Sequence, residues 1–281
     1  MRRLLSTMSK SASRRFAPLK TANADQKSDL PKLQGIIFDV DGTLCLPQNY
    51  MFTEMRSVLG IPKTTDILAH ISSLPPSSRV AAMDKIKAIE RTAMSSQQPQ
   101  PGLTTLMTYL QTRGIRKAIC TRNFDTPVTH LLNKFLDGIT FDPIVTRDFN
   151  PPKPDPAGLL FIARSWGLVR DLTSSNTGKT QQLLDAATQG TQAEQEGAMG
   201  TREEGKEEVG DASSLIMVGD SIDDMTAGRR AGAATVLLVN KENAHLAEHP
   251  HTDFVVKSLD GLVEVLEDGF IGREIGEQSQ P

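Results

Sequence analysis

Acidic residues in this sequence follow directly after short apolar runs, at positions where their side chains could do chemistry. The apolar run GIIF ends in Asp39, and a second carboxylate, Asp41, follows two positions later. The later run SLIMV is followed by GDSIDD, which supplies Asp220 and Asp224. Carboxylates gathered beside buried strands cost free energy unless something positive lies between them. The pattern therefore predicts a site in which several acids hold a cation.

Other polar groups follow the same pattern. The run RKAIC ends at Cys120 and is followed by Thr121, Arg122 and Asn123, while Lys153 stands between prolines in PPKPDP. If these runs are strands of one parallel sheet, their carboxyl ends lie along one edge, where the lysine and the hydroxyl meet the carboxylates. Oxygen ligands with few imidazoles or thiolates favour Mg²⁺. Magnesium beside a lysine and a hydroxyl suits phosphate chemistry, because negative charge on the transferring oxygens must be neutralised.

The elements that must position these residues are short apolar runs alternating with amphipathic helices. The runs are rich in Ile and Val, as strands buried on both faces are. This alternation predicts an α/β fold with a doubly wound parallel sheet and ligands at the carboxyl ends of its strands. The predicted strands are Gly35–Phe38, Arg116–Cys120, Asp142–Val145, Ser214–Val218, Ala234–Val239 and Asp253–Val256.

Residues 46–100 interrupt that order and contain no convincing strand. They favour two or three short helices, around 53–59, 65–71 and 79–94, which are separated by prolines. The sequence therefore predicts a small helical cap inserted after the first strand. The α/β core is then expected over 31–45 and 101–268.

Three further segments differ from the core in composition. The basic, serine-rich extension at 1–30 has no acid before Asp25 and is typical of a mitochondrial transit peptide; the alternative is a basic tail of a cytoplasmic protein. Residues 173–214 have no aromatic residue and many Gly, Gln and Glu, which predicts a disordered acidic loop. Residues 269–281 are expected to form a flexible tail.

Composition limits the classes of partner. The chain has 281 residues and a net charge of -3, so nothing in it indicates nucleic acid as a partner. No window reaches the roughly 18 apolar residues of a membrane span. The expected partner is a small-molecule phosphate ester.

The motifs as a set resemble a known family. DVDGT at Asp39, Thr121 after a strand, Lys153 in KPDP and GDSIDD at Asp220 are similar, in this order, to the four motifs of the haloacid dehalogenase (HAD) superfamily. The spacing resembles the branch with a helical cap after the first motif, the phosphoglycolate-phosphatase-like group. The resemblance implies a Mg²⁺-dependent phosphatase acting on a small phosphorylated metabolite. Because dehalogenases of the family lack an acid at the position of Asp41, phosphoryl transfer is favoured over dehalogenation.

The resemblance also implies a role for each motif acid. Asp39 would be the nucleophile that forms an aspartyl-phosphate. Asp41 would protonate the leaving alcohol and then take a proton from the attacking water. Asp39, the backbone carbonyl of Asp41, and Asp220 would hold Mg²⁺, with Asp224 as a further ligand or as an anchor.

The remaining candidates concern phosphate and substrate. Thr121 and Lys153 would bind phosphoryl oxygens, with Asn123 nearby, and Gly42 would let backbone amides approach the phosphate. Arg122 either holds a substrate anion or pairs with a neighbouring acid. In the cap, the cations that could bind a substrate carboxylate or a second phosphate are Arg56, Lys63 and Arg79.

Two other functions stay open from the sequence. A sugar-phosphate phosphomutase would use the same residues but return the phosphate to a sugar, and it needs a cap that excludes water. A binding or regulatory module without catalysis would use the acidic loop as its partner site. The filled motif positions argue against such a module.

Overall fold

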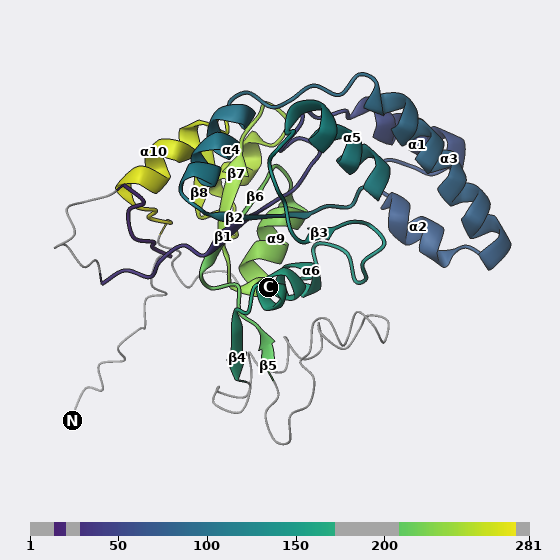
Figure 1. Ribbon diagram of the computed structural model, residues 1–281. Coiled ribbons are helices and arrows are strands. Elements are labelled where there is room, and N and C mark those ends of the chain that lie inside the picture. The colour runs from purple at the N-terminus through teal and green to yellow at the C-terminus, as the bar shows by residue number, and fades with distance from the viewer. Residues whose placement is uncertain (1–13, 21–28, 172–207, 274–281) are drawn as a thin grey trace, which may run out of the picture.

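A parallel sheet forms the centre of the computed structural model, which describes residues 14–20, 29–171 and 208–273 (Figure 1). Its six strands lie in the order β3-β2-β1-β6-β7-β8, and every neighbouring pair is parallel. The predicted α/β fold is thereby confirmed. The strands are β1 (Gly35–Phe38), β2 (Arg116–Cys120), β3 (Ile144–Val145), β6 (Leu215–Gly219), β7 (Ala234–Leu238) and β8 (Phe254–Val256).

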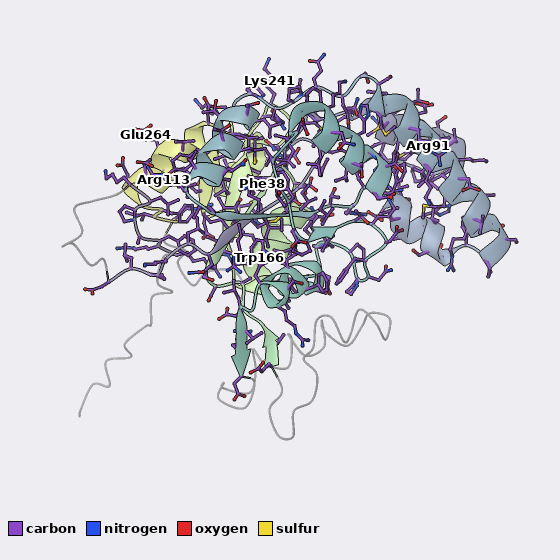
Figure 2. All side chains as sticks on the ribbon, in the orientation of Figure 1. Phe38, Arg91, Arg113, Trp166, Lys241 and Glu264 are labelled. Carbon is purple, nitrogen blue, oxygen red and sulfur yellow. The ribbon has the colours of Figure 1, made fainter. Side chains whose placement is uncertain are left out.

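Helices cover both faces of this sheet. Ile36 and Phe38 of β1 pack in one core cluster, and Ile37 packs in the other, as the alternation of side chains along a strand requires. Phe38 lies near the middle of the molecule (Figure 2). The first cluster includes α4 (Leu103–Thr112), α5 (Asp125–Phe135) and α10 (Gly261–Asp268), and the second includes α6 (Ala157–Ser165) and α9 (Ile222–Ala231). A short 3₁₀ helix, η2, spans Ala244–Glu248.

The predicted helical cap is present as three helices beside the sheet (Figure 1). They are α1 (Tyr50–Leu59), α2 (Ile67–Ser73) and α3 (Pro76–Met94). Asp66 caps α2 by accepting a hydrogen bond from the amide of Ala69 at 2.8 Å, and Pro76 occupies the first position of α3. The cap has its own apolar core, which includes Met55, Ile71 and Ile86. It can therefore hold its shape while it lies over the edge of the sheet.

A small hairpin projects from the side of the sheet that lies away from the cap (Figure 1). Its strands, β4 (Val169–Asp171) and β5 (Glu208–Gly210), pair antiparallel. The prediction of a disordered loop was wrong for residues 208–214, because Val209 is buried and β5 approaches α6 closely. A Cβ on Gly210 would lie 2.0 Å from the carbonyl oxygen of Leu160. The rest of the predicted loop lies outside the described residues.

Parts of both predicted terminal extensions pack onto the core. Phe16 is 2 % exposed, its ring centroid lies 5.8 Å from that of Phe270, and its amide donates to the Phe270 carbonyl at 2.9 Å. The prediction of a flexible tail was therefore wrong for residues 269–273, where the buried Phe270 fixes the chain. Residues 14–20 likewise belong to the folded core, whereas 1–13, 21–28 and 274–281 lie outside the described residues.

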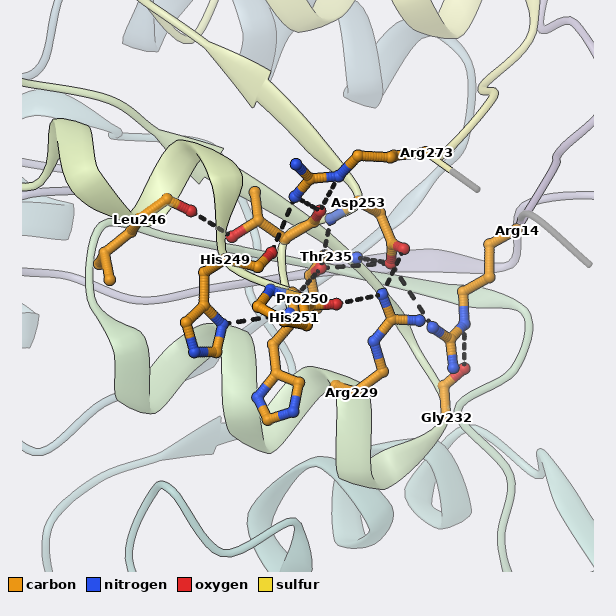
Figure 3. A network of polar contacts seen from close by, with 11 residues as sticks. Arg14, Arg229, Gly232, Thr235, Leu246, His249, Pro250, His251, Asp253 and Arg273 are labelled. Atoms are coloured by element: carbon orange, nitrogen blue, oxygen red, sulfur yellow. Dashed lines mark hydrogen bonds and ion pairs between the residues drawn. The ribbon is translucent and has the colours of Figure 1, made fainter. Parts of the chain in front are cut away.

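A polar network fastens the N-terminal segment to the sheet (Figure 3). Asp253 is its centre: it receives hydrogen bonds from the Thr235 amide at 2.9 Å and from Arg229 at 2.6 Å. Arg14 lies 3.5 Å from the same carboxylate and also donates to the carbonyl of Gly232 at 3.0 Å. Two arginines balance the buried charge of Asp253, so the network joins residue 14 to β7 and α9. In the described part of the chain, no helix has the length and apolar character needed to cross a membrane.

Candidate active site

A cavity of about 340 Å³ lies between the carboxyl edge of the sheet and the cap. It is lined by residues from both parts, and several predicted site residues meet there although they are far apart in the sequence. These are Asp39, Asp41, Arg56, Thr121, Arg122, Asn123, Lys153, Asp220 and Asp224. The exposed Lys63 and Arg79 do not line it.

The end of β1 places the first two acids. The amide of Asp39 donates to the carbonyl of Val218 at 3.0 Å, which continues the pairing of β1 with β6 by one residue. The chain then turns back on itself, because the amides of Thr43, Leu44 and Cys45 all donate to the carbonyl of Val40. Asp39 and Asp41 therefore stand at the start of a tight turn at the edge of the sheet.

Lys153 joins two of the acids. Its Nζ lies 2.8 Å from Oδ1 of Asp39 and 2.5 Å from Oδ1 of Asp224. Burial alone would lower the pKa of Lys153, but the charges of Asp224 and Asp39 outweigh burial and raise it. The ammonium group therefore stays charged between the two carboxylates.

Asp224 is held by the first turn of α9. Its Oδ2 accepts hydrogen bonds from the amide of Ser221 at 3.0 Å and from the Ser221 hydroxyl at 2.6 Å. The Asp224 amide donates back to the Ser221 hydroxyl at 3.3 Å, which completes a capping box. Since its other oxygen binds Lys153, Asp224 anchors the lysine to the helix.

Three carboxylates at this edge could hold a metal ion. Asp39, Asp220 and Asp224 each offer an oxygen, and these atoms lie within 4.8 Å of one another. Burial and the neighbouring acids raise the pKa of Asp220 to about 8, and burial raises that of Asp39 to about 6. A cation would relieve this repulsion, and a donor set of oxygens suits Mg²⁺.

Gly42 makes room for this acidic cluster. Its φ is +77°, a region that favours glycine, and a Cβ there would lie 2.0 Å from Oδ2 of Asp220. Its carbonyl accepts a hydrogen bond from the side chain of Gln100 at 2.6 Å. Gly42, which was predicted to let backbone amides approach the phosphate, thus lies directly against the metal-ligand candidate Asp220.

Asp41 has surroundings different from those of Asp39. Its Oδ1 accepts a hydrogen bond from the thiol of Cys45 at 3.5 Å, and its carboxylate is also hydrogen-bonded by Asn123. Burial raises the pKa of Asp41, while the bonds from Asn123 and Cys45 and the charge of Arg147 act in the opposite direction. A carboxyl group with a raised pKa is suited to giving and taking protons.

Thr121 and Asn123 come from the loop after β2. The Thr121 amide donates to the Val145 carbonyl at 2.9 Å, and its buried hydroxyl accepts from the Asn123 amide at 3.3 Å. Thr121, whose hydroxyl can also donate a hydrogen bond, lines the cavity together with Asp39 and Lys153.

Arg122 binds acids of both the core and the cap. Its Nη1 lies 2.6 Å from Asp223 on α9, and its Nη2 lies 2.5 Å from Asp66 at the start of α2. The sequence left two interpretations open for Arg122, and the structure shows the one in which it pairs with neighbouring acids. Arg122 therefore connects the cap to the edge of the sheet.

A second connection between the cap and the core was not predicted from the sequence. Arg147, just after β3, forms a buried ion pair with Glu90 of α3. It also donates from Nε to the Arg122 carbonyl at 3.0 Å, and its amide donates to the Asn123 carbonyl at 2.8 Å. Burial raises the pKa of Glu90 to about 7. A basic residue two positions after a predicted strand was the available signal, but its partner lies in the cap.

Comparisons with known proteins agree with this architecture. A family model described as HAD-hydrolase-like matches residues 178–262. A protein of Saccharomyces cerevisiae named as an uncharacterized hydrolase is 38% identical over 85% of this chain and 91% of its own length. A haloacid dehalogenase-like hydrolase domain-containing protein of Arabidopsis thaliana is 28% identical over 85% of this chain and 86% of its own.

A solved structure supports the fold. The crystal structure of CbbY from Rhodobacter sphaeroides in complex with phosphate matches with a TM-score of 0.52 and 18% identity. The match covers 82% of this chain and 96% of that one.

Proposed function

Because this chain belongs to the HAD-like hydrolase superfamily, we propose that it is a Mg²⁺-dependent phosphatase of small phosphorylated metabolites. The observation that carries the proposal is the pair of carboxylates at the end of β1. The ammonium group of Lys153 binds Asp39 and favours its ionised form, whereas burial raises the pKa of Asp41 and favours its protonated form. One acid is thus placed as a charged nucleophile and the other as a proton donor.

The proposed reaction has two steps. A carboxylate oxygen of Asp39 attacks phosphorus, the bond to the ester oxygen breaks, and Asp41 gives its proton to the departing alcohol. Asp41, now ionised, takes a proton from water, which attacks the aspartyl-phosphate and releases inorganic phosphate. Asp39 then returns as a carboxylate and Asp41 as an acid, so the cycle closes.

The surrounding residues stabilise the negative charge that develops. Lys153, charged between Asp39 and Asp224, and the hydroxyl of Thr121 would bind the phosphoryl oxygens. Mg²⁺ held by Asp39, the carbonyl of Asp41, Asp220 and, as a further ligand, Asp224 would neutralise charge on the phosphate. The capping box of α9 keeps Asp224, and through it Lys153, in position before substrate arrives.

The shape of the site favours a small substrate. A cavity of about 340 Å³ is near the lower end of the roughly 300–1,000 Å³ usual for small-molecule sites. The similar fold of CbbY was solved in complex with phosphate. Both observations support a phosphate ester of metabolite size.

The test is hydrolysis of p-nitrophenyl phosphate by the full chain, with Mg²⁺ and with a chelator. Asp39→Asn should lower kcat by about a thousandfold or more, because the amide is not a nucleophile. Asp125→Asn, an exposed acid on α5 outside the cavity, serves as the matched control and should keep full activity. Equal activity of Asp39→Asn and wild type, or activity that survives chelation unchanged, would refute the proposal.

A further inference from the structure

The charged groups that line the cavity are mostly paired with one another. Lys153 binds two acids of the core, Arg122 binds Asp66 and Asp223, and Arg147 binds Glu90. Arg122 and Arg147 thus hold the cap to the core, and Lys153 lies at the proposed position of the ester phosphate. An anion arriving with the substrate would have to compete with a carboxylate for each of them.

Arg56 is different. Among the described residues that line the cavity, it is the cation without a carboxylate partner. Its one hydrogen bond runs from Nη1 to the Phe52 carbonyl of its own helix at 3.3 Å, and its Nε is buried without an acceptor. A buried donor that lacks an acceptor is unfavourable. The guanidinium group therefore has several donors free for a ligand.

The position of Arg56 in α1 does not by itself explain why its guanidinium group lines the cavity. A cation in the last turn of a helix gains from the helix dipole, but that gain needs no contact with a cavity. Arg56 instead lies in the cap wall beside apolar side chains that line the same cavity, namely Phe52, Met55, Ile67, Leu68 and Ile86. An apolar surrounding strengthens the attraction between a guanidinium group and an anion.

From these contacts we infer the substrate class. This inference rests on the proposed phosphatase function. The substrate is a phosphate ester with a second anionic group, a carboxylate or a further phosphate, at the end of a short carbon chain. Its ester phosphate lies at Asp39 and Lys153, its carbon chain packs on the apolar cap wall, and its second anion binds Arg56. A planar guanidinium group can bind either anion through two parallel hydrogen bonds.

The test compares three series of esters with equal chain lengths: n-alkyl phosphates, ω-carboxyalkyl phosphates and α,ω-alkanediol bisphosphates. We expect wild type to prefer at least one anionic series over the alkyl phosphates by about 10- to 100-fold in kcat/KM. The two anionic arms distinguish a carboxylate from a second phosphate. The favoured chain length reports the distance from the catalytic edge to Arg56.

Arg56→Gln should abolish this preference by raising KM for the anionic ester, and should leave kcat for alkyl phosphates within roughly threefold. Arg56→Lys should keep part of the preference, since it retains the charge but not the planar fork. The control is Lys63→Gln, an exposed cap cation outside the cavity, which should change nothing. Thermal unfolding of each variant verifies the fold.

Two outcomes separate this inference from the proposed function. Equal kcat/KM for all three series in wild type, or a preference that survives in Arg56→Gln, would overturn the role of Arg56 and leave the phosphatase in place. Absence of Mg²⁺-dependent hydrolysis of every ester, p-nitrophenyl phosphate included, would remove the phosphatase and the substrate class together.

Discussion

At the scale of single residues, the acids at the strand ends were predictable because each follows a strand along the chain. The end of β1 positions Asp39, and the end of β6 positions Asp220. The partners of these acids were harder to predict. Glu90 and Arg147 pair only because α3 lies over the end of β3, and no spacing in the sequence specifies that contact.

Gly42 offers a test of how closely the turn after β1 must approach Asp220. Gly42→Ala should reduce kcat/KM for a phosphate ester by about a hundredfold, because the added Cβ would lie 2.0 Å from Oδ2 of Asp220 and must displace it. The Mg²⁺ concentration for half-maximal activity should rise as well. Steady-state kinetics over a Mg²⁺ titration measure both effects.

The matched control for this change is Gly114→Ala. Gly114 has a similar φ, +65°, but a Cβ there would meet nothing within 4 Å. It should cost about 1–2 kcal/mol of stability, from the left-handed backbone alone, and leave activity unchanged. If Gly42→Ala behaves like Gly114→Ala, the close packing of Gly42 on Asp220 has no part in catalysis.

At the scale of elements, the strand and cap helix predictions were good where apolar patterns are long enough to read. The hairpin strands β4 and β5 have three residues each, which is too short for an alternating pattern to appear. The cap helices were found, but nothing in their sequence shows how they lie on the core. That placement depends on contacts such as Arg122 with Asp66 and Arg147 with Glu90.

The ion pair of Arg147 and Glu90 should therefore matter for the stability of the whole chain. Glu90→Ala should lower the free energy of unfolding by about 3 kcal/mol, since it leaves the charge of Arg147 buried and unpaired. The double variant Glu90→Leu with Arg147→Met should lose less free energy of unfolding than Glu90→Leu alone, because the double variant buries no lone charge. Urea unfolding of the single and double variants measures the coupling.

Asp84→Asn is the control, because Asp84 lies on the exposed face of the same helix. Its unfolding free energy should stay within about 0.5 kcal/mol of wild type. If the effects of the Glu90 and Arg147 substitutions on the free energy of unfolding were additive, the two side chains would not be coupled. Arg147 would then contact the cap without joining it to the core.

At the scale of the whole molecule, the N-terminal segment is part of the core. Phe16 packs on Phe270, and Arg14 reaches Asp253, which directly precedes β8 and is bonded to Thr235 near the start of β7 (Figure 3). The basic composition of the first residues still favours mitochondrial import, which we propose as the localisation. Cleavage near Asp25 would remove Phe16 from the core, so any processing should end at or before Arg14.

Truncation tests this argument directly. A chain that begins at Arg14 keeps every described contact of the segment, whereas one that begins after Thr21 loses Phe16, whose side chain is 2 % exposed. The second chain should be less stable by at least about 3 kcal/mol, and Phe16→Ala in the full chain should cost about 3–5 kcal/mol. Urea unfolding measures the free energies, and mass spectrometry of the N-terminus of the chain isolated from cells locates any cleavage. Equal stability of the two truncated chains, or a mature N-terminus beyond Phe16, would show that residues 14–20 lie on the core without stabilising it.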